Sequence, residues 1–214
     1  MKYIIMCGGE YKDFKIPKQL LKINGERIVD RTIKLLKENG IDLNDIAISS
    51  NDKRFDSCLV KRLEHNNGFI LENGKSISGF WLDAFYPSNN PVTYLYGDVY
   101  YSEDAIKTIV RTNTDYILFF ASRNIRRKDY FKEWEEPFAF KVANQEKFRE
   151  YINKAKKLFL DGQCNREPIS WELYRIINGY DINLHVIGIN FVAIDDYTTD
   201  IDTVEDIKKL EEIL

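Results

Sequence analysis

The sequence contains few of the residues that build covalent frameworks or soft-metal sites. Its 214 residues include three cysteines, Cys7, Cys58 and Cys164, and two histidines. The cysteines lie far apart and leave an odd thiol, so neither a disulfide scaffold nor a thiolate metal site is indicated. This usage is typical of a reduced protein, and we expect a cytoplasmic location.

Long apolar runs and an excess of positive charge are also missing. The apolar run at the N-terminus is too short for a signal-peptide core, and no stretch approaches the length of a membrane span. The net charge of −3 argues against non-specific nucleic-acid binding. We therefore expect neither a membrane nor a nucleic acid among the partners.

An ordinary globular composition, 44% hydrophobic and 30% charged, is arranged as alternating strands and helices. The alternation up to residue 122 predicts parallel strands joined by helical crossovers in one α/β domain, residues 1–214. The patterns predict strands at 2–7, 45–50, 68–73, 115–122 and 183–194, and one within 91–101 that ends at Gly97-Asp98. They predict helices at 26–40, 52–66, 76–86, 102–113, near 144–160 and 169–178, and at the C-terminal end.

Gly8 and Gly9 follow the first expected strand, at the edge where a parallel sheet binds its ligands. Glycine lets main-chain N–H groups turn toward an anion and lets a phosphate approach the backbone closely. Lys12 and Lys18 add cations, and Pro17 fixes the backbone immediately before Lys18. The pattern predicts a phosphate-binding loop, with a surface turn carrying solvated lysines as the alternative.

The opening, a strand followed by C-G-G and then P-K-Q-L-L-K-I-N-G-E, resembles the nucleotidyltransferases that make activated sugars and alcohols. In that family the glycine loop wraps a nucleoside triphosphate, and the lysine after the proline contacts phosphate. The resemblance implies that Cys7, Gly8 and Gly9 form the nucleotide loop and that Lys18 is catalytic. The loop has no arginine, so Lys12 stands where the family often has one.

Two central stretches resemble the same family in the same order. "KSISGFWLDAF" is similar to the base-contacting segment of cytidylyltransferases, with Lys75 and Ser78 at the matching positions. An ordinary helix N-terminus is the alternative there. "YLYGDVYYS" is similar to the family's L-x-G-D, which implies that Gly97 belongs to the nucleotide site and that Asp98 binds Mg²⁺. A carboxylate at a strand end suits a cation that bridges phosphates.

The segment "DIDTVEDIKKLEEI" is similar to the family's closing motif, in which an aspartate before the last helix supplies a second metal carboxylate. Asp202 takes that position, and Asp200 is a neighbour that is able to help. The structural alternative is a capping box formed by Thr203 and Asp206. The two interpretations are compatible, because Thr203 can cap the helix while Asp202 faces the metal.

The resemblance implies a three-layer, Rossmann-like fold of the GT-A type, with a mixed, mainly parallel sheet and helices on both faces. Residues 1–122 would form the nucleotide-binding half, and 123–214 the acceptor-binding half with its closing helix. The implied reaction is Mg²⁺-dependent transfer of a nucleotide, from CTP in the first instance, to a phosphorylated sugar, polyol or amino alcohol. Such an enzyme would serve cell-surface polymer synthesis, and a homodimer is common for this architecture.

Fewer sequence motifs identify residues that would bind the acceptor. The resemblance implies an acceptor-phosphate role for Lys141 as a second catalytic lysine. Arg123, with Arg126 and Arg127, offers cations for an anionic acceptor, and a solvated charged loop is the alternative. Trp134 and Trp171 are candidates for an acceptor wall, with a core role as the default. His65 and His185 are interpreted as structural residues.

Three other functions fit parts of the pattern. A uridylyl- or thymidylyltransferase differs only in the base that it binds. A metal-dependent glycosyltransferase shares the fold but typically carries D-x-D, whereas here Asp98 is followed by valine and tyrosine. A catalytically dead nucleotide-binding relative is suggested by the missing loop arginine, but such a protein has no need of two metal carboxylates.

Overall fold

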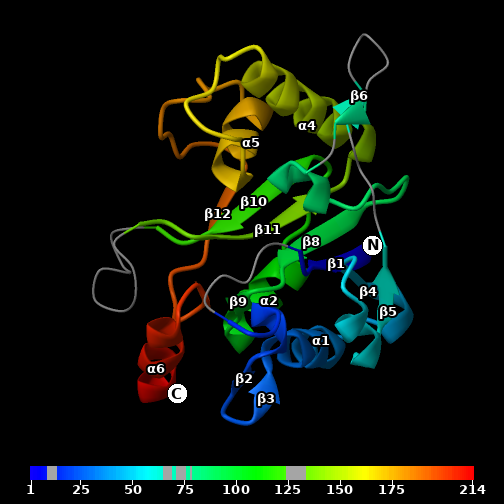
Figure 1. The fold of residues 1–214 in the computed structure, drawn as a ribbon, viewed down its shortest axis with the longest axis vertical. Helices are drawn as coiled ribbons and strands as arrows, with labels where there is room; N and C mark the ends of the chain where they lie inside the picture. The colour runs from blue at the N-terminus through cyan, green and yellow to red at the C-terminus, as the bar shows by residue number, and fades with distance from the viewer. Residues whose placement is uncertain (9–13, 65–68, 71–75, 78, 124–133) are drawn as a thin grey trace.

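A seven-stranded sheet forms the middle layer of the fold, with strand order β12-β10-β11-β8-β1-β4-β5. The computed structural model describes residues 1–8, 14–64, 69–70, 76–77, 79–123 and 134–214. Figure 1 shows helices on both faces of the sheet and another beside it. Within the described residues, the α-helices are α1 (Ile28–Glu38), α2 (Glu103–Arg111), α4 (Gln145–Leu160), α5 (Ser170–Ile177) and α6 (Val204–Ile213).

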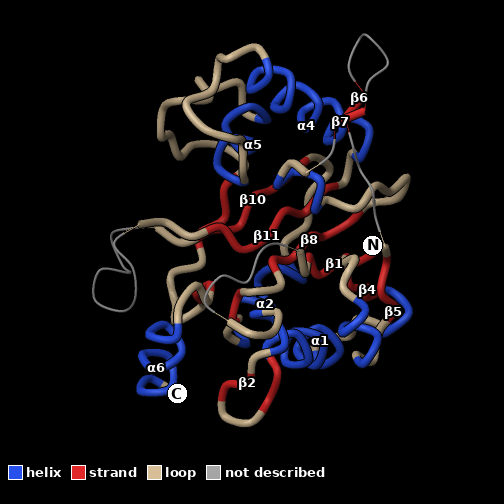
Figure 2. Tube along the Cα trace, in the orientation of Figure 1, coloured by secondary structure: helices blue, strands red, loops and turns tan. Residues whose placement is uncertain are grey.

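The sheet is mixed and mainly parallel, as expected. β1 runs parallel to β4 and β8, β4 parallel to β5, and β10 parallel to β12, whereas β11 is antiparallel to both β8 and β10. Strands from both expected halves therefore share one sheet between the helices (Figure 2). The strands are β1 (Lys2–Met6), β4 (Ile46–Ser49), β5 (Lys61–Leu63), β8 (Val92–Tyr96), β10 (Ile117–Ala121), β11 (Pro137–Val142) and β12 (Phe191–Ala193).

Most of the strands are continuous apolar runs because helices cover both faces of the sheet. All five residues of β8 are buried. The core between β11 and α4 is rich in aromatic rings, including Phe119 stacked on Phe140 with centroids 4.6 Å apart. Helix α2 begins where its cap predicts, because the Ser102 hydroxyl accepts a hydrogen bond from the N–H of Ala105.

Three sequence predictions are wrong in detail. The helix predicted at 52–66 is not formed in its described part, residues 52–64: a 3₁₀ turn, η3 (Lys53–Ser57), is followed by β5, which pairs with β4. Asp52 does cap, but it caps this short turn. The strand predicted at 183–194 is confined to β12, because Asn190 takes a φ of +57° and turns the chain immediately before it. The helix predicted at 76–86 is a strand, β7 (Ser76–Ile77), and a 3₁₀ turn, η4 (Trp81–Ala84).

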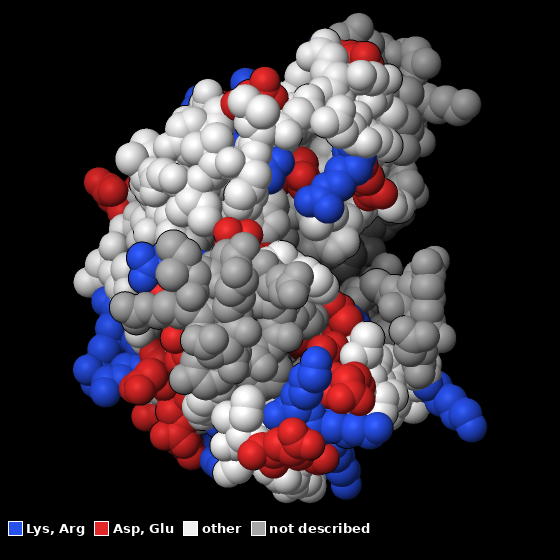
Figure 3. Space-filling view, turned by 90° about the vertical axis from the view of Figure 1, so that its left-hand side faces the viewer, with Lys and Arg blue, Asp and Glu red and all other residues white. Residues whose placement is uncertain are grey.

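Charged side chains of both signs are interspersed on the face of the molecule shown in Figure 3. This mixture agrees with the small net charge of −3. Within the described ranges, no helix combines the length and apolarity needed to cross a bilayer.

Lys141 is a buried lysine in the middle of the sheet. It lies on β11 and is 2% exposed, and its Nζ donates to the carbonyls of Val110 and Thr112 at the end of α2, at 3.1 and 2.6 Å. These carbonyls have no partner within the helix, so the lysine satisfies them. Burial lowers the pKa of Lys141 to about 8.

The depressed pKa of Lys141 makes stability depend on pH. Between about pH 8 and the ordinary lysine value of 10.5, the unfolded chain binds more protons than the folded one, so stability rises with pH. Relative to Lys141→Met, the wild type should gain up to about 3 kcal/mol over this window. Urea unfolding at several pH values measures the difference. Lys154→Met, at an exposed position of α4, controls for the loss of one charge, and equal pH slopes for wild type and Lys141→Met would contradict the prediction.

Gly97 allows the ends of β1 and β8 to approach closely. A Cβ at this position would lie 2.6 Å from the Cys7 Sγ and 2.6 Å from the main-chain oxygen of Met6. The N–H of Gly97 donates to that same oxygen, at 2.9 Å. Glycine is therefore required here by space, and the following residue, Asp98, is held at the strand end.

Gly97→Ala should destabilise the protein by about 1–3 kcal/mol, because the new methyl group meets a main-chain atom that cannot turn away. Gly8→Ala is the matched control, since a Cβ there meets nothing within 4 Å. Urea or thermal unfolding of both variants provides the test. Equal stability of the Gly97→Ala and Gly8→Ala variants would contradict the prediction, because it would show that the ends of β1 and β8 can move apart without cost.

Candidate active site

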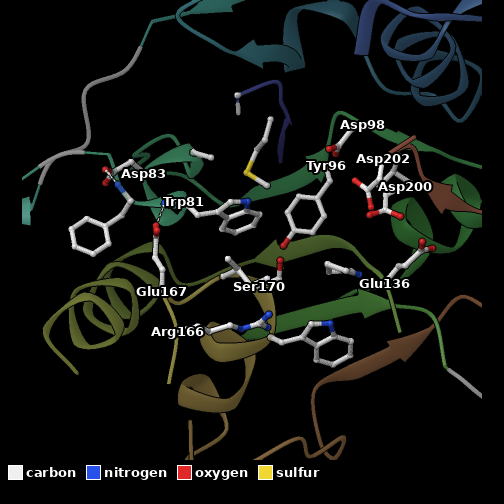
Figure 4. A pocket seen from close by; sticks show the side chains of 18 of the residues that line it. Trp81, Asp83, Tyr96, Asp98, Glu136, Arg166, Glu167, Ser170, Asp200 and Asp202 are labelled. Carbon is white, nitrogen blue, oxygen red and sulfur yellow. Dashed lines mark hydrogen bonds between the residues drawn. The ribbon is translucent and has the colours of Figure 1, made fainter. Parts of the chain in front are cut away.

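A cavity of about 1120 Å³ opens at the carboxyl ends of neighbouring parallel strands. Met6 closes β1, Asn51 follows β4, and Tyr96 and Asp98 lie at the end of β8; all four line the cavity. This is the edge at which open parallel sheets bind ligands. The remaining wall comes from η4, from the segment before β11 and from the beginning of α5. Figure 4 shows how the labelled side chains converge.

Lys18 lies between two carboxylates at one end of this cavity. Its Nζ is 3.0 Å from the Asp98 Oδ2 and 3.0 Å from the Asp202 Oδ1. Lys18 begins the 3₁₀ turn η1 (Lys18–Leu20) directly after Pro17, whose φ of −49° and ψ of 130° mark the end of the extended chain. The sequence predicted these three side chains, and the structure brings them together.

A short strand pair brings Asp202 next to Asp98. β9 (Val99–Tyr100), immediately after Asp98, pairs antiparallel with β13 (Thr199–Asp200). The N–H of Ile201 then donates to the carbonyl of Asp98, at 2.9 Å. This pairing also places Asp200 at the site, and Figure 4 shows the three aspartates clustered.

The predicted capping box fixes the chain on the other side of Asp202. The Thr203 hydroxyl accepts from the N–H of Asp206, and the Asp206 carboxylate accepts from the N–H groups of Asp202 and Thr203. These bonds begin α6 and hold the main chain of Asp202. The capping and site interpretations of this motif are therefore both compatible with the structure.

The electrostatics of this cluster favour a bound cation. Burial raises the pKa of Asp98 above its ordinary value, and the charge of Asp200 adds to this, while Lys18 opposes it. Burial alone would lower the pKa of Lys18, but Asp98 and Asp202 reverse the effect and raise it. Lys18 therefore stays protonated, and three carboxylates face one ammonium group.

The donor set suits Mg²⁺ that also binds substrate phosphates. In the described part of the chain, no group of three or more His, Cys, Asp or Glu side chains has the arrangement of a protein-only metal site. Mg²⁺ commonly uses one or two carboxylates and completes its shell with waters and phosphates. Asp98 and Asp202 meet this requirement, because one Nζ already lies 3.0 Å from an oxygen of each.

The other predicted residues divide into three groups. Gly8 lines the cavity, whereas Cys7 and Gly97 support it from below by packing on each other. Lys141 is not brought to the site, because it points to the end of α2. Four residues lie outside what the structure describes: Gly9, Lys12, Lys75 and Ser78.

Of the residues considered for acceptor binding, some line the cavity and others do not. Arg123 does not line the cavity; it forms an ion pair with Asp195, at 2.5 Å. Arg126, Arg127 and His65 fall outside the described ranges. Trp134, Trp171 and His185 do line the cavity, so the structural interpretation of His185 is incomplete.

His185 bridges two charged residues of the wall. Its Nδ1 is 3.2 Å from a terminal nitrogen of Arg175, and its Nε2 is 3.4 Å from Glu135. Arg175 is buried, donates to Glu172 and to the carbonyl of Ile182, and leaves its Nε without a partner. Burial lowers the pKa of this guanidinium.

The sequence interpretation missed several lining residues. Tyr96 had a usable signal, because it stands two residues before Asp98, and alternate residues of a strand share a face. Its hydroxyl points toward Ser170 at the centre of the cavity. Trp81, Arg166 and Ser170 had no such signal, because they come from a 3₁₀ turn, a loop and a helix start.

No protein-family model and no curated protein matches the chain. Solved structures match it over almost its whole length. CTP:phosphocholine cytidylyltransferase (LicC) of Streptococcus pneumoniae superposes with a TM-score of 0.55, covering 99% of this chain and 98% of its own, at 18% identity. HddC of Yersinia pseudotuberculosis, solved with GMP-PN, superposes with a TM-score of 0.53, covering 99% and 98%, at 14% identity. The resemblance to nucleotidyltransferases is thus confirmed at the level of the fold.

Proposed function

We propose that the protein is a nucleotidyltransferase that joins the nucleoside monophosphate of an NTP, with CTP favoured, to a small phosphorylated acceptor. The observation that carries this proposal is the convergence of Lys18, Asp98 and Asp202 at the carboxyl-end edge of the sheet. The cavity there, about 1120 Å³, exceeds the usual range for one small ligand and has room for two.

In the proposed reaction, a phosphate oxygen of the acceptor attacks the α-phosphorus of the triphosphate. A new P–O bond forms, the bond from the α-phosphorus to its bridging oxygen breaks, and pyrophosphate leaves with that electron pair. Such a transfer needs positioning and charge neutralisation, with little covalent help from the protein. The lack of a nucleophilic side chain in the mechanism is therefore no obstacle.

The position of each site residue suggests its role in this reaction. Lys18, already protonated and at the cavity edge, turns its ammonium group toward the triphosphate and stabilises the leaving pyrophosphate. The backbone at Gly8 is open to close approach by a phosphate, since nothing lies within 4 Å of where its Cβ would be. Asp98 and Asp202 would hold Mg²⁺, which would supply Lewis-acid stabilisation of phosphate charge.

Several finer features remain part of the proposal. CTP is favoured over UTP and dTTP on the sequence of the 75–85 segment, in which Lys75 and Ser78 lie outside the described residues. LicC, which shares the fold, is a cytidylyltransferase by name. A cytoplasmic location, a role in cell-surface polymer synthesis and a homodimer complete the proposal.

Asp98→Asn and Asp202→Asn should remove the Mg²⁺-dependent part of nucleotide binding, because a neutral amide is a poor partner for a divalent cation. In the wild type, CTP at 100 times its dissociation constant with Mg²⁺ should add about 2.7 kcal/mol of stability. Thermal unfolding with CTP, UTP, dTTP, ATP and GTP, each with and without Mg²⁺, measures this and identifies the base.

Asp45→Asn is the matched control, since Asp45 pairs with Lys2 at the opposite end of the sheet. It should retain the full Mg²⁺-dependent shift. A normal shift in Asp98→Asn would refute the metal assignment. A shift with a nucleotide sugar but with no triphosphate would favour glycosyl transfer, and none with either would favour a dead relative.

Lys18→Met should lower kcat on the order of 10²–10³-fold, by analogy with the loss of one preorganised electrostatic donor. Release of pyrophosphate from CTP with a phosphorylated acceptor measures the rate. The exposed Lys154→Met should leave it unchanged. An unchanged kcat in Lys18→Met would show that this lysine serves only to neutralise Asp98 and Asp202.

A further inference from the structure

One wall of the cavity, residues 79–84, is built without strand pairing; we call it the η4 segment. It contributes Gly79, Phe80, Trp81, Asp83 and Ala84 to the lining. None of the strand pairings in the described chain includes these residues, and η4 itself is a single 3₁₀ turn. Gly79 takes a φ of +98°, in the left-handed region that favours glycine. The shape of this wall therefore depends on contacts made by side chains.

The carboxylate of Asp83 ties the η4 segment together and joins it to α4. Its Oδ2 accepts from the N–H groups of Gly79 and Phe80, both at 2.9 Å. Its Oδ1 forms an ion pair with the Nζ of Lys156 on α4. The side chains of Asp83 and Lys156 are 11% and 3% exposed, so little water competes for the pair. Charged hydrogen bonds are strongest where water is excluded.

Lys156 reaches this pair from the buried face of α4. It is 2% exposed, whereas Lys154 on the same helix is exposed. Its Nζ lies 5.4 Å from the centre of the Phe80 ring. That ring also meets Phe159 of α4 edge to face, with centroids 6.0 Å apart. Helix α4 therefore contacts both the carboxylate and the first ring of the η4 segment.

Glu167 holds the η4 segment from a second direction. Its Oε1 accepts from the main-chain N–H of Trp81, at 2.6 Å, across 86 positions of sequence (Figure 4). The Trp81 ring in turn packs edge to face on Tyr96, with centroids 5.6 Å apart. The η4 segment is thus fastened to α4, to the chain before α5 and to the end of β8.

These contacts make the second half of the chain shape a wall that the first half provides. The η4 segment lies in residues 1–122, whereas Lys156 and Glu167 lie in 123–214. In Figure 4, Tyr96 lies between the η4 segment and the aspartates, so a nucleotide with its phosphates at Lys18 brings its other end to this wall. The 75–85 sequence resembles a base-contacting segment, which assigns the base to the same place.

We propose that Glu167, and Lys156 acting through Asp83, are positioning residues that hold the η4 segment in the shape that binds the base of the nucleotide. The proposal deepens the proposed function and rests on it for the identity of the ligand. Loss of either contact lets the η4 segment take other shapes, which weakens nucleotide binding and the choice of base. The chemical step at Lys18 and Asp98 is left intact.

Two variants of Glu167 separate its hydrogen bond from its charge. Glu167→Ala removes the acceptor of the Trp81 N–H, whereas Glu167→Gln keeps an oxygen there and removes only the charge. Amide hydrogen exchange followed by NMR reads this bond directly. The Trp81 amide should exchange about tenfold faster in Glu167→Ala, the equivalent of one hydrogen bond, and at the wild-type rate in Glu167→Gln. An unchanged rate in Glu167→Ala would overturn the proposal.

Pyrophosphate release measures what the η4 segment does for the substrate. Glu167→Ala should raise KM for the preferred nucleotide about tenfold and lower its preference over the other bases, with kcat changed by less than about twofold. Glu167→Gln should behave as the wild type. Equal losses in both variants would show that the charge of Glu167 contacts the ligand itself. That result, or a rise in KM for the acceptor alone, would overturn the positioning role.

The Lys156–Asp83 pair is tested in the same two ways. Lys156→Met should speed exchange at the amides of Gly79 and Phe80 and raise the same KM, whereas the exposed Lys154→Met should change neither. Asp83→Ala/Lys156→Met removes both charges of the pair, so it stays folded where the single variant does not, and it should show the same two effects. Wild-type exchange and KM in the double variant would overturn the role of the pair.

Failure of this inference and failure of the proposed function give different results. Pyrophosphate release by the wild type, with KM and base preference unchanged in Glu167→Ala, would overturn the inference and leave the nucleotidyltransferase standing. No pyrophosphate release by the wild type from any NTP would refute the proposed function and the assignment of the base. Exchange at the Trp81 amide would still decide whether Glu167 holds the η4 segment.

Discussion

The ammonium group of Lys18, held between Asp98 and Asp202, is the interaction on which the site depends. Lys18 and Asp202 are 184 positions apart, and Asp98 lies at the end of a central strand between them. One charge therefore joins the turn after the first strand, the end of β8 and the loop before α6. The pairing of β9 with β13 and the capping box of α6 set the position of Asp202, and the contact at Gly97 sets that of Asp98.

The same cluster explains why the proposed function includes a bound cation. Lys18 neutralises part of the charge of three aspartates. The pKa of Asp98 is nevertheless raised, because burial and the negative charge of Asp200 outweigh the effect of Lys18. A triphosphate entering such a site needs cations to accompany it. In the described lining of the cavity, Asp and Glu residues outnumber Lys and Arg residues by seven to three, so the excess of carboxylates extends beyond this cluster.

The sequence predicted the nucleotide end of the site better than the rest. Glycines and an aspartate at strand ends, and a capping box before a helix, can be identified from the local sequence alone. The structure does bring Lys18, Asp98 and Asp202 together. Lys141 was misplaced because both faces of a central strand are buried. There a lysine that satisfies helix carbonyls looks the same in sequence as one that faces a ligand. The helix predicted at 52–66 failed because pairing with β4, a tertiary interaction, decided the structure of 61–63.

The part of the cavity wall that holds the tryptophans could not be predicted because its residues share no pattern. Trp81, Trp134 and Trp171 come from a 3₁₀ turn, the segment before β11 and the first turn of α5. A tryptophan is equally apolar in a core and in a ligand wall, so its sequence context alone leaves the core as the default. Exposure separates the two cases, and it depends on which segments the fold brings together. The strand ends thus place the cluster of Lys18, Asp98 and Asp202, whereas irregular segments place the rest of the cavity wall.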